Sequence, residues 1–160
     1  MDKTLNEYVS VYKSQLNIGD IQIAYERLLK YVMTLKSDFE KENQNKFSCG
    51  NVSHGYMDFT YFPFFDSFLR SKKLRFGIVL NHKNMRFELW LMGQNSEVQH
   101  QYWDLLKSTK WNINQPFMPK YSVLETVLVE NPDFDNLNEL TTEIMKKANS
   151  LTDEIVNFIK

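Results

Sequence analysis

The alternation of residue types between positions 74 and 92 constrains the fold more than any other part of the sequence. In both halves of this stretch, large apolar residues occupy every second position, as in strands with one buried face. A two-residue turn at 83–84 would pair Leu80 with Phe87 and align the other aliphatic pairs on the same face. A slip of one residue would move charged side chains into the core, so the sequence determines the register of this hairpin strongly.

Helical spacing of apolar residues predicts two helices near the N-terminus and a long helix over 137–158 near the C-terminus. The first two helices cover 5–16 and 20–39 and have almost no linker, which favours a helical hairpin. Gly19 is expected to end the first helix in the left-handed conformation. Asp20 is expected to cap the second with its carboxylate.

The remaining segments predict two further strands and one further helix. One strand covers 56–62 and ends near Pro63, which lacks the amide proton that a sheet ladder needs. The other strand covers 121–130, and a helix begins at Ser96, where Gln99 would complete a capping box. Polar, turn-rich sequence predicts loops at 41–55 and 109–120. We therefore expect one α+β domain over 1–160, with a mainly antiparallel sheet of about four strands.

The composition narrows the classes of protein to which the chain can belong. Aromatic residues make up 14% of the 160 residues, against only five glycines and four prolines, which excludes a disordered or loop-rich chain. A single cysteine excludes an internal disulfide framework. The first residues lack the apolar stretch of a signal peptide, and no apolar run is long enough to cross a membrane. A cytoplasmic protein without a membrane partner is expected. Most rings are assigned to the core, including those of Tyr8, Tyr12, Tyr25, Phe39, Phe59, Phe76, Phe87, Tyr102 and Phe158.

Charge is distributed unevenly along the chain. Residues 70–120 contain nine basic and three acidic residues, a net charge of +6, whereas 121–160 contain three and eight, a net charge of −5. The basic segment could attract an anionic partner. The alternative is a purely structural role, in which the acidic segment folds over the basic one or both are solvated surfaces. A pI of about 6.3 disfavours non-specific nucleic-acid binding without excluding it.

The candidate site is the face of the sheet opposite the aliphatic pairs. On this face the hairpin pairs Asn81 with Arg86 and Gly77 with Trp90, and the bare glycine would leave room for the indole. If a helix covers the face, its polar groups pair with one another; if the face is open, it forms a polar cleft with an aromatic wall. The candidate ligand-binding residues are Asp58, Thr60, Arg75, Asn81, Arg86, Glu88 and Trp90.

No established catalytic motif is present in the sequence. The residue types at Cys49 and His54 would suit a nucleophile and its base, but nothing in the polar loop around Cys49 would lower its pKa. The three histidines lie in different predicted elements and do not have metal-ligand spacing. No metal or cofactor is therefore expected.

Short stretches along nearly the whole chain resemble a family of uncharacterised bacterial proteins of about this length. The resemblance implies a stand-alone bacterial domain and brings no activity with it. The stretches are Gly19-Asp20-Ile21-Gln22 with Ala24-Tyr25, Gly55-Tyr56-Met57-Asp58 with Thr60-Tyr61-Phe62, Arg86-Phe87-Glu88-Leu89-Trp90-Leu91, Tyr102-Trp103, and Asn131-Pro132-Asp133-Phe134.

The order helix, three strands, helix, strand also resembles the core of the restriction-endonuclease-like fold. That family holds a divalent metal with acidic residues and a lysine near the second and third strands. Glu88 matches the acidic position of the third strand, but Trp90 stands where the lysine is needed. Asp58 and Asp66 are the only acidic residues close before the second strand.

The sequence therefore leaves three functions open. The first is a non-catalytic domain that binds a small molecule or a protein through the polar sheet face and the aromatic loop at Trp111 and Phe117. The second is a diverged metal-dependent nuclease or phosphodiesterase that uses Asp58 and Glu88. The third is a structural subunit of a homo-oligomer, such as a homodimer, with the C-terminal helix as its interface.

Overall fold

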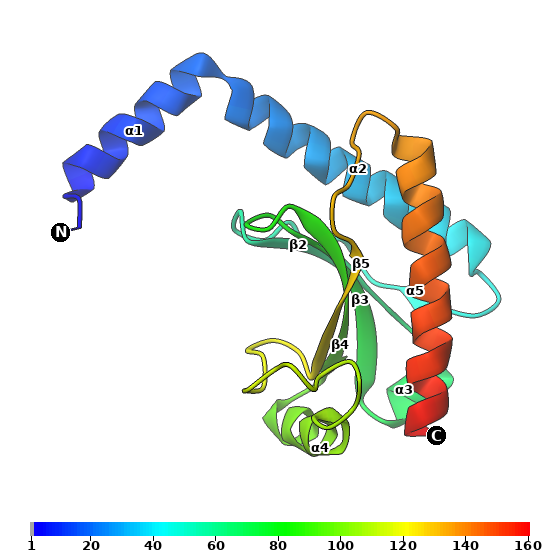
Figure 1. Ribbon diagram of the computed structural model, residues 1–160. Coiled ribbons are helices and arrows are strands. Elements are labelled where there is room, and N and C mark those ends of the chain that lie inside the picture. The colour runs from blue at the N-terminus through cyan, green and yellow to red at the C-terminus, as the bar shows by residue number, and fades with distance from the viewer. Residues whose placement is uncertain (1) are drawn as a thin grey trace.

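The computed structural model describes residues 2–160 and has the expected α+β architecture (Figure 1). These residues form five helices and five strands. In order they are α1 (Leu5–Ile18), α2 (Asp20–Glu42), β1 (Ser48–Cys49), β2 (Phe59–Phe65), α3 (Ser67–Ser71), β3 (Leu74–Asn81), β4 (Arg86–Gly93), α4 (Ser96–Leu106), β5 (Leu124–Val129) and α5 (Leu137–Ile159).

The sheet has the order β1-β2-β3-β4-β5, and all neighbouring strands are antiparallel. The predicted register of the central hairpin is confirmed, with Leu80 opposite Phe87 and Asn81 opposite Arg86. Its turn is longer than expected, since the four residues 82–85 lie outside the ladder. Met85 has a φ of 47° and so provides the left-handed conformation that closes the turn.

One face of the sheet carries the main core. The C-terminal half of α2 and the length of α5 lie against it, on the right of the sheet in Figure 1. The largest fully buried side chains are phenylalanines, so much of the aromatic surplus does fill the core. They are Phe39, Phe62, Phe64, Phe76 and Phe87.

The two N-terminal helices do not pack together as a hairpin. Gly19 ends α1 with a φ of 87°, as expected, but α1 then projects away from the body and has no buried residue (Figure 1). The expectation that Tyr8 and Tyr12 are core residues is therefore wrong, because they are 52% and 65% exposed. Helical periodicity predicts an apolar face, but it does not say whether anything in the same chain covers that face.

The cap of α2 also differs from expectation. Asp20 is the first residue of α2 rather than its cap, and the capping position is Gly19, which makes no side-chain hydrogen bond. In contrast, α1 has a complete capping box between Thr4 and Glu7. Thus α1 has a formed cap at each end although it packs on nothing in the body.

Strand β2 continues through Pro63 and pairs on both sides. Its partner on the outer side is the short strand β1, which lies in the segment 41–55 that we expected to be a loop. The carbonyl oxygen of Pro63 accepts a hydrogen bond from the Gly50 N–H on that side, at 2.9 Å. The missing amide proton of Pro63 therefore faces the short edge strand and not β3, where it would break the central ladder.

Helix α4 begins where the sequence predicts it, with a different cap. Asn95, not Ser96, is the capping residue, and its side-chain oxygen accepts from the Val98 N–H at 3.0 Å. The Gln99 side chain does not complete a capping box with Ser96. Its Oε1 accepts from the Gly93 N–H at 2.7 Å and so ties α4 to the end of β4.

Candidate functional site

The second face of the sheet has a small cluster of apolar side chains, all of which come from the strands. Val79, Trp90 and Met92 are buried in it, with Phe59 and Tyr61 partly buried against them. In Figure 1 this face is on the left of the sheet, and α2 and α5 lie on the opposite side. Within the described residues, the hydrogen-bond partners of the polar groups beside this cluster come from strands and turns and not from a helix.

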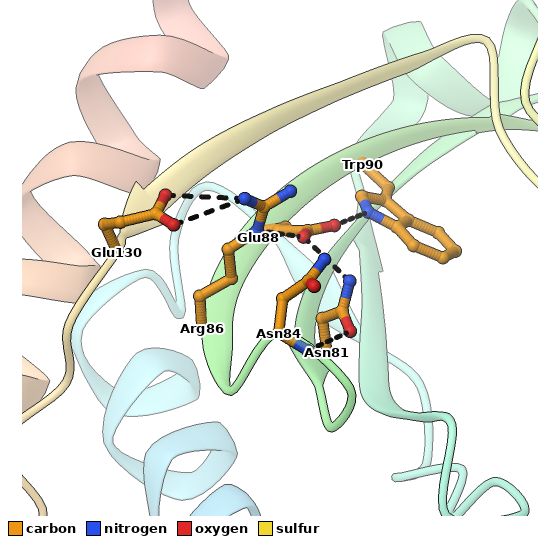
Figure 2. Close-up of polar contacts among 6 residues, drawn as sticks. All are labelled: Asn81, Asn84, Arg86, Glu88, Trp90 and Glu130. Carbon is orange, nitrogen blue, oxygen red and sulfur yellow. Dashed lines mark hydrogen bonds and ion pairs between the residues drawn. The ribbon is translucent and has the colours of Figure 1, made fainter.

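Glu88 is the centre of the polar network on this face (Figure 2). Its side chain is 3% exposed, and both carboxylate oxygens are used. Oε1 accepts from the Trp90 indole N–H at 2.8 Å, while Oε2 accepts from Arg86 Nε at 2.6 Å and Asn81 Nδ2 at 3.0 Å. Three donors therefore neutralise and solvate a carboxylate that burial would otherwise destabilise.

Arg86 extends the network to the next strand. Its Nη1 reaches both carboxylate oxygens of Glu130, just beyond β5, at 3.3 and 3.4 Å (Figure 2). The hydrogen bond that Arg86 donates to Glu88 raises the pKa of Arg86 further above its already high ordinary value. Sequence patterning did not identify Glu130, because only the pairing of β4 with β5 brings it near Arg86.

The turn and β5 add two more polar groups that the sequence did not indicate. The Asn84 backbone N–H donates to Asn81 Oδ1 at 3.2 Å, which fixes the amide orientation that Glu88 requires. Glu125 pairs across the ladder with Trp90, and its pKa is raised, mainly by burial. The nearby Glu88 charge adds to this rise, whereas a hydrogen bond from Ser122 opposes it.

Two of the seven expected site residues lie elsewhere. Thr60 is opposite Leu80 and therefore lies on the aliphatic face, so its assignment to the polar face is wrong. Its hydroxyl donates to the His54 carbonyl at 2.7 Å and lies 2.8 Å from His82 Nε2. Asp58 lies in the turn before β2, where its Oδ1 accepts from the Tyr56 and Phe59 N–H groups. These hydrogen bonds lower the pKa of Asp58.

Arg75 lies on the expected strand but far from the network. It pairs with Met92 at the opposite end of the hairpin from Asn81 and is exposed. The space over Gly77 is also filled differently from our expectation. A Cβ at Gly77 would lie 2.7 Å from the Met92 methyl group and 3.4 Å from the Tyr61 ring, so these two side chains occupy the gap that we assigned to Trp90.

Burial changes the pKa of two groups of types that can act in catalysis, Cys49 and His82. Burial raises the pKa of the Cys49 thiol to about 11, which disfavours the nucleophilic thiolate. The pKa of His82 is lowered by burial. Among residues 2–160, no three His, Cys, Asp or Glu side chains are grouped as a metal site would require.

The aromatic loop after α4 is split between the core and the surface. Trp111 packs on the core, with its ring 5.8 Å from that of Phe158 on α5. Phe117 is 80% exposed. Phe158 itself is 50% exposed, so its assignment to the interior is only partly right.

Comparison with known proteins identifies a family and adds no activity. None of the helices in the described part of the chain is long and apolar enough to cross a membrane. Neither the curated proteins nor the solved structures include a match to the chain. The family model for the domain of unknown function DUF7000 matches residues 5–159, and the chain belongs to this family.

Proposed function

We propose that this protein is a non-catalytic protein-binding domain and that its N-terminal arm, residues 5–23, is the binding element. The observation that carries the proposal is a well-capped helix that buries none of its 14 residues. Large apolar side chains are exposed along the arm. They are Leu5, Tyr8, Val9, Val11, Tyr12, Ile18, Ile21 and Ile23.

A helix that packs on nothing has little stability of its own in water. Isolated helices shorter than about 12 to 15 residues are marginal in water, so most of the stability of such a helix comes from packing its apolar face. Leu5, Tyr8, Val9 and Tyr12 are spaced at intervals of three and four and so form one stripe on α1. Contiguous exposed apolar surface of this size marks an interaction site on a protein surface.

The partner in this proposal is a second copy of the chain. The eight apolar side chains are 41–77% exposed. At on the order of 100 Å² each, they offer about 800 Å², which is one partner's share of a standard interface. Two arms packed about a two-fold axis would cover each other with the same surface. The arm contains two acidic residues, Glu7 and Asp20, and one basic residue, Lys13, so its net charge of −1 opposes the pairing of two arms only weakly.

The Glu88 network has a supporting role in this proposal. Asn81, Trp90 and Arg86 already satisfy both oxygens of Glu88. A ligand at this carboxylate would have to displace donors that hold β3 and β4 in register. We therefore assign the network to the stability of the body that carries the arm.

Light scattering of the purified protein at micromolar concentration tests the proposal. We expect a mass about twice the 19.1 kDa of one chain, falling toward one chain on dilution by mass action. Tyr8→Lys with Tyr12→Lys should give one chain at every concentration, because two charges enter the apolar stripe. Neither tyrosine is buried, so the body should remain folded.

A matched control places the same two charges on the other side of the helix. Ser10→Lys with Asn17→Lys adds lysines on the side of α1 away from its exposed apolar residues, at two exposed positions. This variant should retain the mass of two chains. A wild-type protein that stays at one chain throughout, or a Tyr8 and Tyr12 variant that still forms pairs, would contradict the proposal.

A further inference from the structure

A hollow of about 270 Å³ lies beside the start of β3, away from the arm and from the Glu88 network. Its walls come from the end of β2, α3, the turn after α3, the start of β3 and the end of β4. Three cationic side chains and one amide line it: Arg70, Lys73, Arg75 and Gln94. A water molecule takes up about 30 Å³ of liquid, so the hollow can hold a group several times larger.

The positive charge of this hollow is not neutralised by the protein. Within residues 2–160, none of Arg70, Lys73 and Arg75 forms an ion pair, although eight ion pairs occur elsewhere. The segment 70–75 contains four basic residues and no acidic residue. Asp66, the acidic residue closest before it, caps α3 by accepting from the Leu69 N–H at 2.8 Å. Part of the positive charge of the basic segment 70–120 is therefore located at this hollow.

The backbone places these cations together. Lys73 has a φ of 57°, a conformation that costs energy for a residue with a side chain, and its carbonyl oxygen accepts from the Gln94 N–H at 2.9 Å. That contact brings the turn before β3 against the end of β4. The Arg70 guanidinium stacks on the Phe65 ring, 4.7 Å from its centroid, which limits the orientations that it can adopt.

We propose that this hollow binds the phosphate group of a small phosphorylated compound. Phosphate is a doubly charged anion with several acceptor oxygens, and guanidinium groups match it with paired N–H donors. Lys73 supplies a compact third charge, and Gln94 supplies an amide that can donate to a further oxygen. A carboxylate would use fewer of these donors and carries only one charge. The site does not depend on the proposed function of the arm.

Isothermal titration calorimetry with pyrophosphate tests this site directly. A parallel titration uses a single-stranded oligonucleotide as the second probe. We expect pyrophosphate to bind and to weaken as salt is added, because charge dominates the contact. Lys73→Gln with Arg75→Gln should weaken binding about tenfold or more, as expected when charged hydrogen bonds are lost. Arg27→Gln with Lys83→Gln removes the same two residue types from exposed positions elsewhere and should leave binding unchanged.

Each outcome of this experiment decides the proposal. Pyrophosphate binding that is lost only in the Lys73 and Arg75 variant supports it. Oligonucleotide binding without pyrophosphate binding would overturn it in favour of a nucleic-acid surface. No binding of either probe, or equal weakening in the two variants, would also overturn it. The thermal unfolding midpoint of each variant, measured without ligand, separates lost binding from lost folding.

Discussion

At the residue scale, Glu88 is a buried carboxylate whose two oxygens accept hydrogen bonds from three side chains. Glu88→Gln keeps the shape of the side chain but turns an NH₂ group toward donors and removes the charge that balances Arg86. Arg86 is partly exposed and can recover some water, so we expect the free energy of unfolding to fall by about 2 to 3 kcal/mol. Urea titration followed by tryptophan fluorescence measures this loss.

Glu130→Gln is the matched control for Glu88→Gln. Glu130 also pairs with Arg86, but its side chain is 59% exposed and its contacts are 3.3 and 3.4 Å long. Its loss should change the free energy of unfolding by less than about 1 kcal/mol. Equal changes in the free energy of unfolding would mean that the buried Glu88 contributes no more to stability than the exposed Glu130, which would contradict the role assigned to Glu88.

Cys49 gives a second prediction at this scale. Burial raises the pKa of its thiol to about 11, two units above the value of 9.0 for an unperturbed thiol. At pH 8 the folded protein should then react with a disulfide reagent about 100-fold more slowly than the unfolded chain, since the thiolate is the reacting form. A chain in denaturant provides the fast reference rate, and a folded rate within a few-fold of it would contradict the shift.

The same shift predicts how Cys49 affects stability at high pH. The unfolded thiol ionises as the pH passes 9.0, whereas the folded thiol keeps its proton until the pH is about 11. Between these values the folded state binds more protons, so stability from this group falls as the pH rises. Cys49→Ser should reduce this part of the decline in stability above pH 9.0, as measured by urea titration across that range.

Single residues also show why part of the candidate site could not be predicted. Asn81, Arg86, Glu88 and Trp90 were placed correctly, because alternation in the central hairpin distinguishes its two faces. Thr60 was placed on the wrong face because β2 has the sequence FTYFPFF, in which aromatic residues occupy both alternating sets. A strand buried on both faces carries no alternation from which a face can be assigned.

At the element scale, two turns contain glycines in the left-handed region and differ in the space around them. Gly55 precedes β2 and has a φ of 76°, and an added Cβ there would collide with the Phe59 carbonyl oxygen. Gly55→Ala should therefore shift the turn that leads into β2 and lower the free energy of unfolding by about 2 to 4 kcal/mol. Calorimetry or urea titration measures the change.

Gly19 provides the control for this substitution. It has a φ of 87°, but an added Cβ there would meet nothing within 4 Å, and the junction holds an arm that buries nothing in the body. Gly19→Ala should leave the unfolding midpoint of the body unchanged, since its backbone cost of about 1 kcal/mol falls on the arm alone. A large effect at Gly19 would show that the arm and the body unfold together.

The elements differ in how well the sequence predicted them. Helix α5 and strand β5 were expected at nearly their observed positions, since each has clear periodicity or β-rich sequence. Strand β1 was missed because two residues are too few to show a pattern. The position of α1 was missed for a different reason: a helical pattern defines an apolar stripe but not the partner that covers it.

At the scale of the whole molecule, the chain consists of a body with one main core and an arm outside it. All three tryptophans, Trp90, Trp103 and Trp111, lie in the body, whereas α1 contributes 14 helical residues outside it. Within residues 2–160, ion pairs join the middle and C-terminal segments at Arg86 with Glu130 and at Lys110 with Glu154, and both acidic side chains are largely exposed. Such pairs add little stability, so packing in the main core determines when the body unfolds.

This division predicts that two probes of unfolding will disagree in a dilute solution. Tryptophan fluorescence should report one cooperative transition of the body, whereas circular dichroism should lose helical signal earlier as α1 melts on its own. The Tyr8→Lys and Tyr12→Lys variant should show this early loss at every concentration, because its arm has no partner. In the wild-type protein, the early loss should disappear at concentrations where light scattering finds two chains. Coincident transitions in the variant would show that α1 is stabilised by the body itself, and the reason for expecting a partner would be lost.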